Sequence, residues 1–74
     1  MTTPDEVRRS IETALPGARV AVTDTTGAGD HFEVAVETAA FAGKTLVEQH
    51  QLVYRALGQL MPQIHALSLR TTVS

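Results

Sequence analysis

The chain has 74 residues, 43 % of them hydrophobic and 19 % charged, which is enough for one folded domain over residues 1–74 with a thin core. It has no cysteine, so a disulfide framework and an all-thiolate metal site made by this chain alone are excluded. The net charge of −2 argues against a general nucleic-acid or membrane-surface binder. No apolar run approaches the ~20 residues of a membrane span, and no signal core is present, so we expect a cytoplasmic protein.

The first predicted element is a helix that begins at Thr3 and ends before Pro16-Gly17. Thr3 can cap this helix, Pro4 suits its first position, and Glu6 stands where a capping box needs an acid. Its buried face is predicted from helical spacing at Val7, Ile11, Ala14 and Leu15.

Residues 18–24 and 31–37 both alternate between apolar and polar positions, which predicts two strands. The glycine-containing turn between them predicts an antiparallel hairpin. This turn is a poor candidate for a phosphate-binding loop, because no lysine follows and the next element is a strand. His31 falls on the polar side of its strand, and the residues alone favour a solvent-facing histidine beside Glu33.

A bend at residues 39–44 leads into a second predicted helix over residues 45–60. Gly58 indicates a break into a shorter helical piece. Leu52 points away from the apolar face, either as a lone exposed leucine or as part of a partner patch with Ala56. His50 is expected to be packed and hydrogen-bonded rather than a ligand, because it lies within the apolar stripe made by Leu46, Val53, Tyr54, Leu57, Leu60 and Met61.

The last stretch, residues 62–71, reads PQIHALSLRT and predicts a buried strand with His65 at its start. A helical crossover before it is long enough for parallel pairing with the second strand. The economical fold is α+β, a three-stranded mixed sheet with its helices on one face. His31 and His65 would then start neighbouring strands and meet at one edge. On the residues alone, His65 is either a structural histidine bonded to backbone or a metal or proton site.

The chain resembles the BolA-like family, small proteins with a class II KH-like fold in the order α-β-β-α-(α)-β. The resemblance covers nearly the whole length. It is carried by the turn at 24–26, Asp30-His31-Phe32, the Phe41-x-Gly43-Lys44 bend, QHQLVY at 49–54 and IHALSL at 64–69.

The resemblance implies a non-enzymatic partner of CGFS monothiol glutaredoxins that shares a 2Fe-2S cluster with them. His65 matches the family's cluster ligand in the terminal strand, and His31 is the candidate for the second donor near the hairpin loop. Partner thiolates, with glutathione supplied through the partner, would complete the ligand set of the cluster. Iron–sulfur clusters are held mainly by thiolates, and this chain has no cysteine to supply them. The protein alone is then expected to be a monomer that forms a heterodimer with the glutaredoxin.

The alternative function is a KH-like nucleic-acid-binding transcriptional regulator. Lys44, Leu52 and Arg70 are the candidate residues for a partner or nucleic-acid surface. Weak binding is expected, because the chain is acidic overall and phosphate contacts supply most nucleic-acid affinity. An enzyme is not expected, because no nucleophile–base spacing is visible and a thin core leaves no room for an enclosed pocket.

Overall fold

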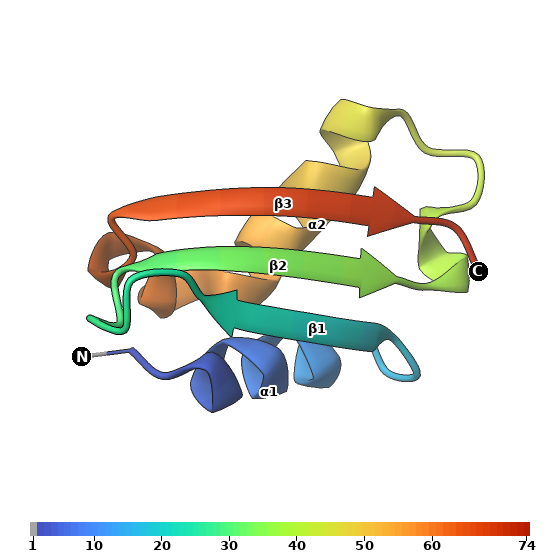
Figure 1. Ribbon diagram of the computed structural model, residues 1–74. Coiled ribbons are helices and arrows are strands. Elements are labelled where there is room, and N and C mark those ends of the chain that lie inside the picture. Colours follow the sequence, from blue (N-terminus) through green and yellow to red (C-terminus); the bar gives the residue numbers. More distant parts are fainter. Residues whose placement is uncertain (1) are drawn as a thin grey trace.

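Two helices, three strands and two short 3-10 helices make up the computed structural model, which describes residues 2–74 (Figure 1). In chain order the elements are α1 (Pro4–Ala14), β1 (Arg19–Asp24), β2 (His31–Glu37), η1 (Ala39–Phe41), α2 (Leu46–Leu57), η2 (Gly58–Gln63) and β3 (Ala66–Thr72). This order confirms the predicted α-β-β-α-(α)-β succession, with η2 as the shorter helical piece that follows Gly58.

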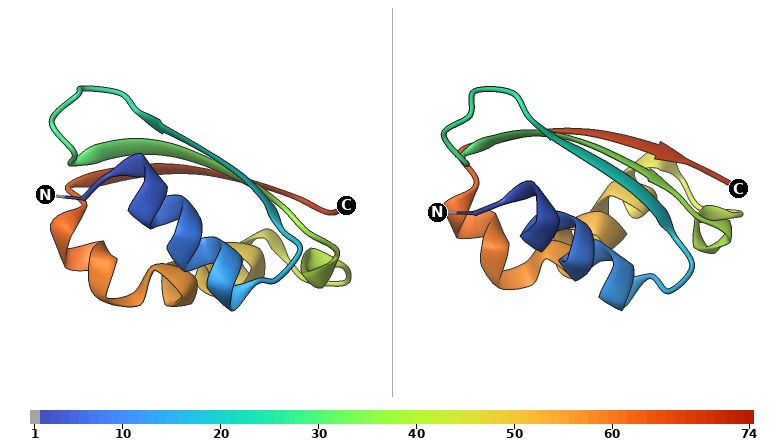
Figure 2. Two further views of the ribbon diagram at one scale, coloured as in Figure 1. Left: turned by 90° about the horizontal axis from the view of Figure 1, so that it is seen from below. Right: turned by 60° about the horizontal axis from the view of Figure 1, so that its bottom comes forward.

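The sheet has the order β1-β2-β3, with β1 antiparallel to β2 and β2 parallel to β3. Both long helices lie on one face of this sheet, and its other face is not covered by residues 2–74 (Figure 2). The helical crossover from β2 through α2 returns the chain to the end of the sheet where β2 began. The α+β fold with a mixed three-stranded sheet is therefore confirmed.

Local sequence signals account for where the helices begin and end. Thr3 and Glu6 form a capping box at α1, and Thr45 and Glu48 form a second one at α2. Each satisfies two amide groups that a helix start leaves unpaired. Gly58 closes α2 with φ +49° and ψ −114°, a backbone conformation that L side chains rarely adopt.

The core fills the space between the two helices and the inner face of the sheet. Phe41, which η1 carries at the far end of β2, is fully buried. The other core side chains are Val7 and Ile11 of α1, Phe32, Val34 and Val36 of β2, Val53 and Leu57 of α2, and Ile64. Strand β2 contributes its whole inner face because it is the central strand.

The predicted apolar stripe of the second helix is only partly correct. Val53 and Leu57 are buried, but Leu46 is 61 % exposed and Tyr54 is 41 % exposed. The first turns of α2 project past the β3 edge, so no strand covers them (Figure 1). Leu52, predicted to point outward, is instead half-buried and packs against the core.

The last strand begins later and is less buried than predicted. Pro62 and Gln63 belong to η2, and β3 starts at Ala66. Leu67 and Leu69 are half-buried, because β3 is an edge strand rather than a central one. Of the helices described, none is both long and apolar enough to span a membrane.

Candidate functional site

His31 and His65 lie together at the end of the sheet where β2 and β3 begin. Their ring centroids are 5.1 Å apart and the rings are nearly perpendicular, at 70°. His31 pairs with Ala66 in the parallel register, so the residue before Ala66 is brought beside it. The main-chain carbonyl of Asp30 accepts hydrogen bonds from the amides of His65 and Ala66, at 2.7 and 3.0 Å. The predicted proximity of the two histidines is confirmed.

The loop that leads into His31 is shaped by Asp24, the last residue of β1. Its carboxylate accepts hydrogen bonds from the amides of Thr26, Gly27 and Gly29, at 3.2, 2.9 and 3.0 Å. Gly27 and Gly29 both have φ +77°, which glycine adopts without steric cost. The β1–β2 loop is therefore a defined turn that delivers the chain to His31 in a fixed direction.

Asp30 also contacts His31 through its side chain. Its Oδ1 lies 2.9 Å from Nδ1 of His31 and accepts a second hydrogen bond from the Thr26 hydroxyl at 3.2 Å. The hydrogen bond with the imidazole, helped by the one from Thr26, holds the pKa of Asp30 below its ordinary value. Sequence patterns did not single out this role, and the only available signal was a carboxylate directly before a histidine.

The two imidazoles offer nitrogen donors to a metal at an accessible edge. The His65 residue is exposed, and the His31 side chain is 35 % exposed. Within residues 2–74, no three His, Asp or Glu side chains gather into a group that could hold a metal ion. Imidazole suits iron, but iron–sulfur clusters are held mainly by thiolates. The pair therefore offers two nitrogen ligands but not a complete metal-ligand set within residues 2–74.

The third histidine, His50, is remote from this pair. It lies next to Gln49, whose side chain accepts a hydrogen bond from Thr71 near the C-terminal end of β3, whereas His65 precedes that strand. His50 packs against Tyr54 with ring centroids 6.4 Å apart. The prediction that it is packed is correct. The prediction that it is hydrogen-bonded is wrong for Nε2, because this buried atom has no hydrogen-bond partner in residues 2–74.

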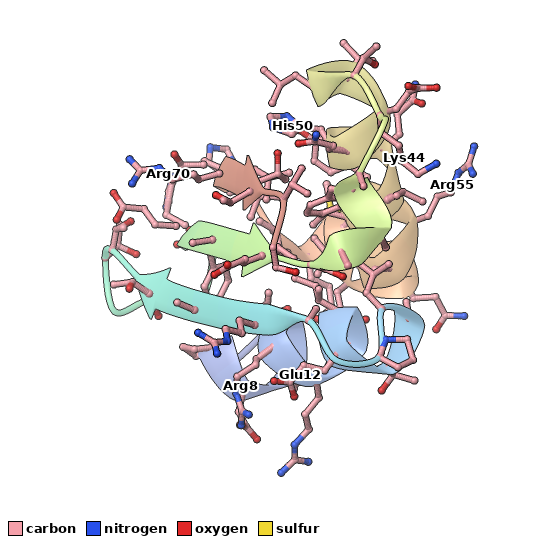
Figure 3. The ribbon with its side chains drawn as sticks, turned by 90° about the vertical axis from the view of Figure 1, so that its right-hand side faces the viewer. Arg8, Glu12, Lys44, His50, Arg55 and Arg70 are labelled. Carbon is pink, nitrogen blue, oxygen red and sulfur yellow. The ribbon has the colours of Figure 1, made fainter. Side chains whose placement is uncertain are left out.

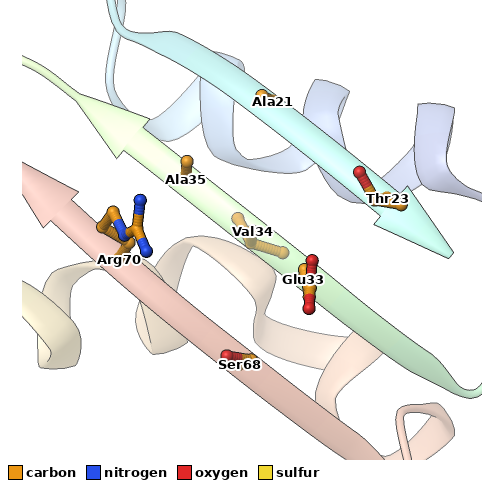
Figure 4. A pocket seen from close by; sticks show the side chains of 7 residues that line it. All are labelled: Ala21, Thr23, Glu33, Val34, Ala35, Ser68 and Arg70. Carbon is orange, nitrogen blue, oxygen red and sulfur yellow. The ribbon is translucent and has the colours of Figure 1, made fainter. Parts of the chain in front are cut away.

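The residues predicted for a partner or nucleic-acid surface do not form one surface. Lys44 and Leu52 line a shallow hollow with Gln51 and Arg55 on the helix side. Arg70 lies on the other side of the molecule (Figure 3), on the outer face of the sheet opposite Ala35. There it borders a second shallow hollow, floored mainly by small side chains and flanked by Glu33 (Figure 4).

Comparison with known proteins gives consistent matches. The model of the BolA-like protein family matches residues 8–74. Protein BOLA2 of Arabidopsis thaliana is 39 % identical over 71 residues, which covers 95 % of this chain and 76 % of that protein. Human BolA-like protein 2 is 36 % identical over 67 residues, 88 % of this chain and 78 % of its own length. The solved structure of a bolA protein homologue from Coxiella burnetii superposes with a TM-score of 0.83 at 41 % identity, covering 99 % of this chain and 92 % of that one.

Proposed function

The chain belongs to the BolA-like family, and on that premise we propose that it is a non-enzymatic partner of a CGFS monothiol glutaredoxin with which it shares a 2Fe-2S cluster. The role would lie in iron–sulfur trafficking or iron regulation. The observation that carries the proposal is the His31–His65 pair, with ring centroids 5.1 Å apart at one edge of the sheet.

His65 is the principal ligand in this proposal and His31 the second donor. The His65 ring can bind a metal at little structural cost, because the residue is exposed and is held to the sheet by the hydrogen bond of its backbone amide rather than by its ring. Loop hydrogen bonds to Asp24 hold the approach to His31 in place. The cluster would supply electron-transfer or cluster-donation chemistry, and this chain would supply two neutral nitrogen ligands.

The partner must supply the thiolates, because the chain has no cysteine. The proposal of a heterodimer with the glutaredoxin is supported by the lack of a third His, Asp or Glu that could complete a metal site with the two histidines in residues 2–74. The absence of thiolates makes a cluster on this chain alone unfavourable.

The test is the mixed complex with a CGFS glutaredoxin, followed by visible circular dichroism. With the wild-type chain we expect a spectrum distinct from that of the glutaredoxin homodimer. His65→Ala should abolish the mixed spectrum and leave the homodimer spectrum, and His31→Ala should weaken or alter it.

His50→Ala is the matched control, because it also removes one imidazole but lies away from the pair. It should leave the mixed spectrum unchanged. An unchanged spectrum in the His65 variant would refute the proposed ligation. An unchanged spectrum in the His31 variant alone would remove only the second donor.

A further inference from the structure

Asp30 forms hydrogen bonds with both histidines of the pair, through its side chain with one and through its main chain with the other. Its carboxylate Oδ1 lies 2.9 Å from Nδ1 of His31. Its main-chain carbonyl accepts the amide hydrogens of His65 at 2.7 Å and of Ala66 at 3.0 Å. One residue therefore joins the start of β2, the entry into β3 and the His31 ring.

The side-chain contact decides which nitrogen of His31 carries the hydrogen. An ionised carboxylate can only accept hydrogen bonds, and a neutral imidazole has one donor and one acceptor nitrogen. An aspartate carboxylate, with an ordinary pKa of about 3.9, is ionised at neutral pH. Nδ1 must then be the donor, and the lone pair is left on Nε2.

The carboxylate is itself held in place. The Thr26 hydroxyl donates to the same Oδ1 at 3.2 Å, and the loop that carries Thr26 is folded around Asp24. The His31 and Asp30 side chains remain 35 % and 43 % exposed, so a second molecule can reach the site.

We propose that Asp30 is the positioning residue of the histidine pair: its carboxylate fixes the Nδ1–H tautomer of His31 and leaves Nε2 as the donor atom for a metal, while its carbonyl sets the place of His65. Metal-binding histidines almost always donate their other N–H to a carboxylate or carbonyl, which fixes the ring and raises its basicity. The metal-binding part of this inference rests on the proposed function, whereas the tautomer belongs to the protein alone.

The first experiment measures the tautomer in the free, full-length protein. The ¹⁵N shifts of the imidazole nitrogens are recorded at about pH 8, above the ordinary histidine pKa of ~6.5, for wild type, Asp30→Asn and Glu33→Gln. In wild type we expect His31 to be protonated at Nδ1. Asp30→Asn should lose this preference, because an amide can also donate a hydrogen bond to Nδ1. The hydrogen bond from the His65 amide to the main-chain carbonyl of residue 30 should remain, because the substitution does not change that carbonyl.

Glu33→Gln is the matched control, since it removes the same charge from the exposed side of β2 but has no hydrogen bond to either histidine in the part of the chain described. It should keep the wild-type tautomer. A wild-type His31 protonated at Nε2, or an Asp30→Asn variant with the wild-type tautomer, would overturn the inference.

The second experiment titrates the cluster-loaded glutaredoxin with the same variants. Loss of an outer partner of a metal ligand typically costs about 10–100-fold in affinity, and we expect this loss for Asp30→Asn but not for Glu33→Gln. If Asp30→Asn matches wild type in a complex that His65→Ala and His31→Ala disrupt, Asp30 has no positioning role and the proposed function survives. If His65→Ala has no effect, the proposed function fails, and the tautomer measurement still decides what Asp30 does to His31.

Discussion

The imidazole rings of His31 and His65 meet at 5.1 Å because β2 and β3 run parallel and start at the same end of the sheet. An antiparallel third strand would have placed the start of β3 beside Glu37, at the opposite end of β2. The crossover through α2 and η2 is therefore what assembles the pair. The proximity of the two histidines therefore depends on the parallel topology of the sheet.

We therefore predict that His65→Ala leaves the fold intact. His65 is exposed. Substituting an exposed side chain away from helix caps and buried networks usually changes the free energy of unfolding by no more than ~0.5 kcal/mol, and we expect a change within this range for His65→Ala. Phe41→Ala should cost about 3–5 kcal/mol, because the side chain is fully buried. Leu67→Ala should fall at the lower end of the leucine range, about 2 kcal/mol, because the side chain is half-buried on an edge strand.

Urea unfolding followed by far-UV circular dichroism measures these differences. A His65→Ala variant as unstable as Phe41→Ala would mean that the imidazole is structural. In that case its loss from the mixed complex could not be attributed to ligation.

The element order and the position of the histidine pair could be predicted because they depend on local and periodic signals. The capping box at Thr3, the break at Gly58 and the alternation in β2 each leave a mark within a few residues. The crossover is long enough to allow parallel pairing of β2 and β3, and parallel pairing brings His31 and His65 to the same end of the sheet.

Exposure and side-chain contacts could not be predicted in the same way. Helical spacing indicates which side chains share a face but not how far the helix extends past the sheet, so Leu46 of the predicted apolar stripe is exposed. The contact of Asp30 with His31 depends on the rotamer of an exposed side chain, which no periodic pattern encodes. His50 lies in the predicted stripe, yet its buried Nε2 finds no partner within residues 2–74.

The cap of α2 predicts a pH dependence of stability. Hydrogen bonds from the amide and hydroxyl of Thr45 lower the pKa of Glu48 from its ordinary 4.5. The Glu48 carboxylate thus takes up a proton more readily in the unfolded chain than in the folded one. Its contribution to folding stability is therefore fully present above about pH 4.5 and is lost as the pH falls through the pKa of Glu48 in the folded protein. Glu48→Gln keeps a neutral acceptor and should flatten this part of the pH profile.

The measurement is the urea midpoint of wild type and Glu48→Gln between neutral pH and about pH 3. Glu33→Gln serves as control, because Glu33 is exposed on the sheet and caps no helix. Parallel pH profiles for wild type and Glu48→Gln would show that the carboxylate contributes nothing to the cap.

Nucleic-acid binding is predicted to be weak and without sequence preference. Of the six basic residues, Arg8 and Arg9 are paired with acids on α1, and Arg70 lies on the other side of the molecule from Lys44 and Arg55 (Figure 3). Few phosphates can be neutralised at once, so the dissociation constant for duplex DNA should exceed about 1 µM at physiological salt. Fluorescence anisotropy against salt concentration tests this, and sub-micromolar, sequence-selective binding would favour the KH-like regulator instead.

The last prediction concerns the redox potential of the proposed mixed complex. Replacing a thiolate by a neutral imidazole removes negative charge from the cluster and stabilises its reduced form. Two histidines on one iron raise the potential from about −400 mV in plant-type ferredoxins to at least about −150 mV in Rieske centres. The reduction potential of the wild-type mixed complex should therefore be more positive than that of the glutaredoxin homodimer. The potential of the His31→Ala complex should fall between these two values, because one imidazole ligand remains. His50→Ala should match wild type, since its ring is remote from the pair. Equal potentials for the mixed complex and the homodimer would contradict histidine ligation, because a change of ligand charge without a change of potential would require an equal and opposite change in the surroundings of the cluster.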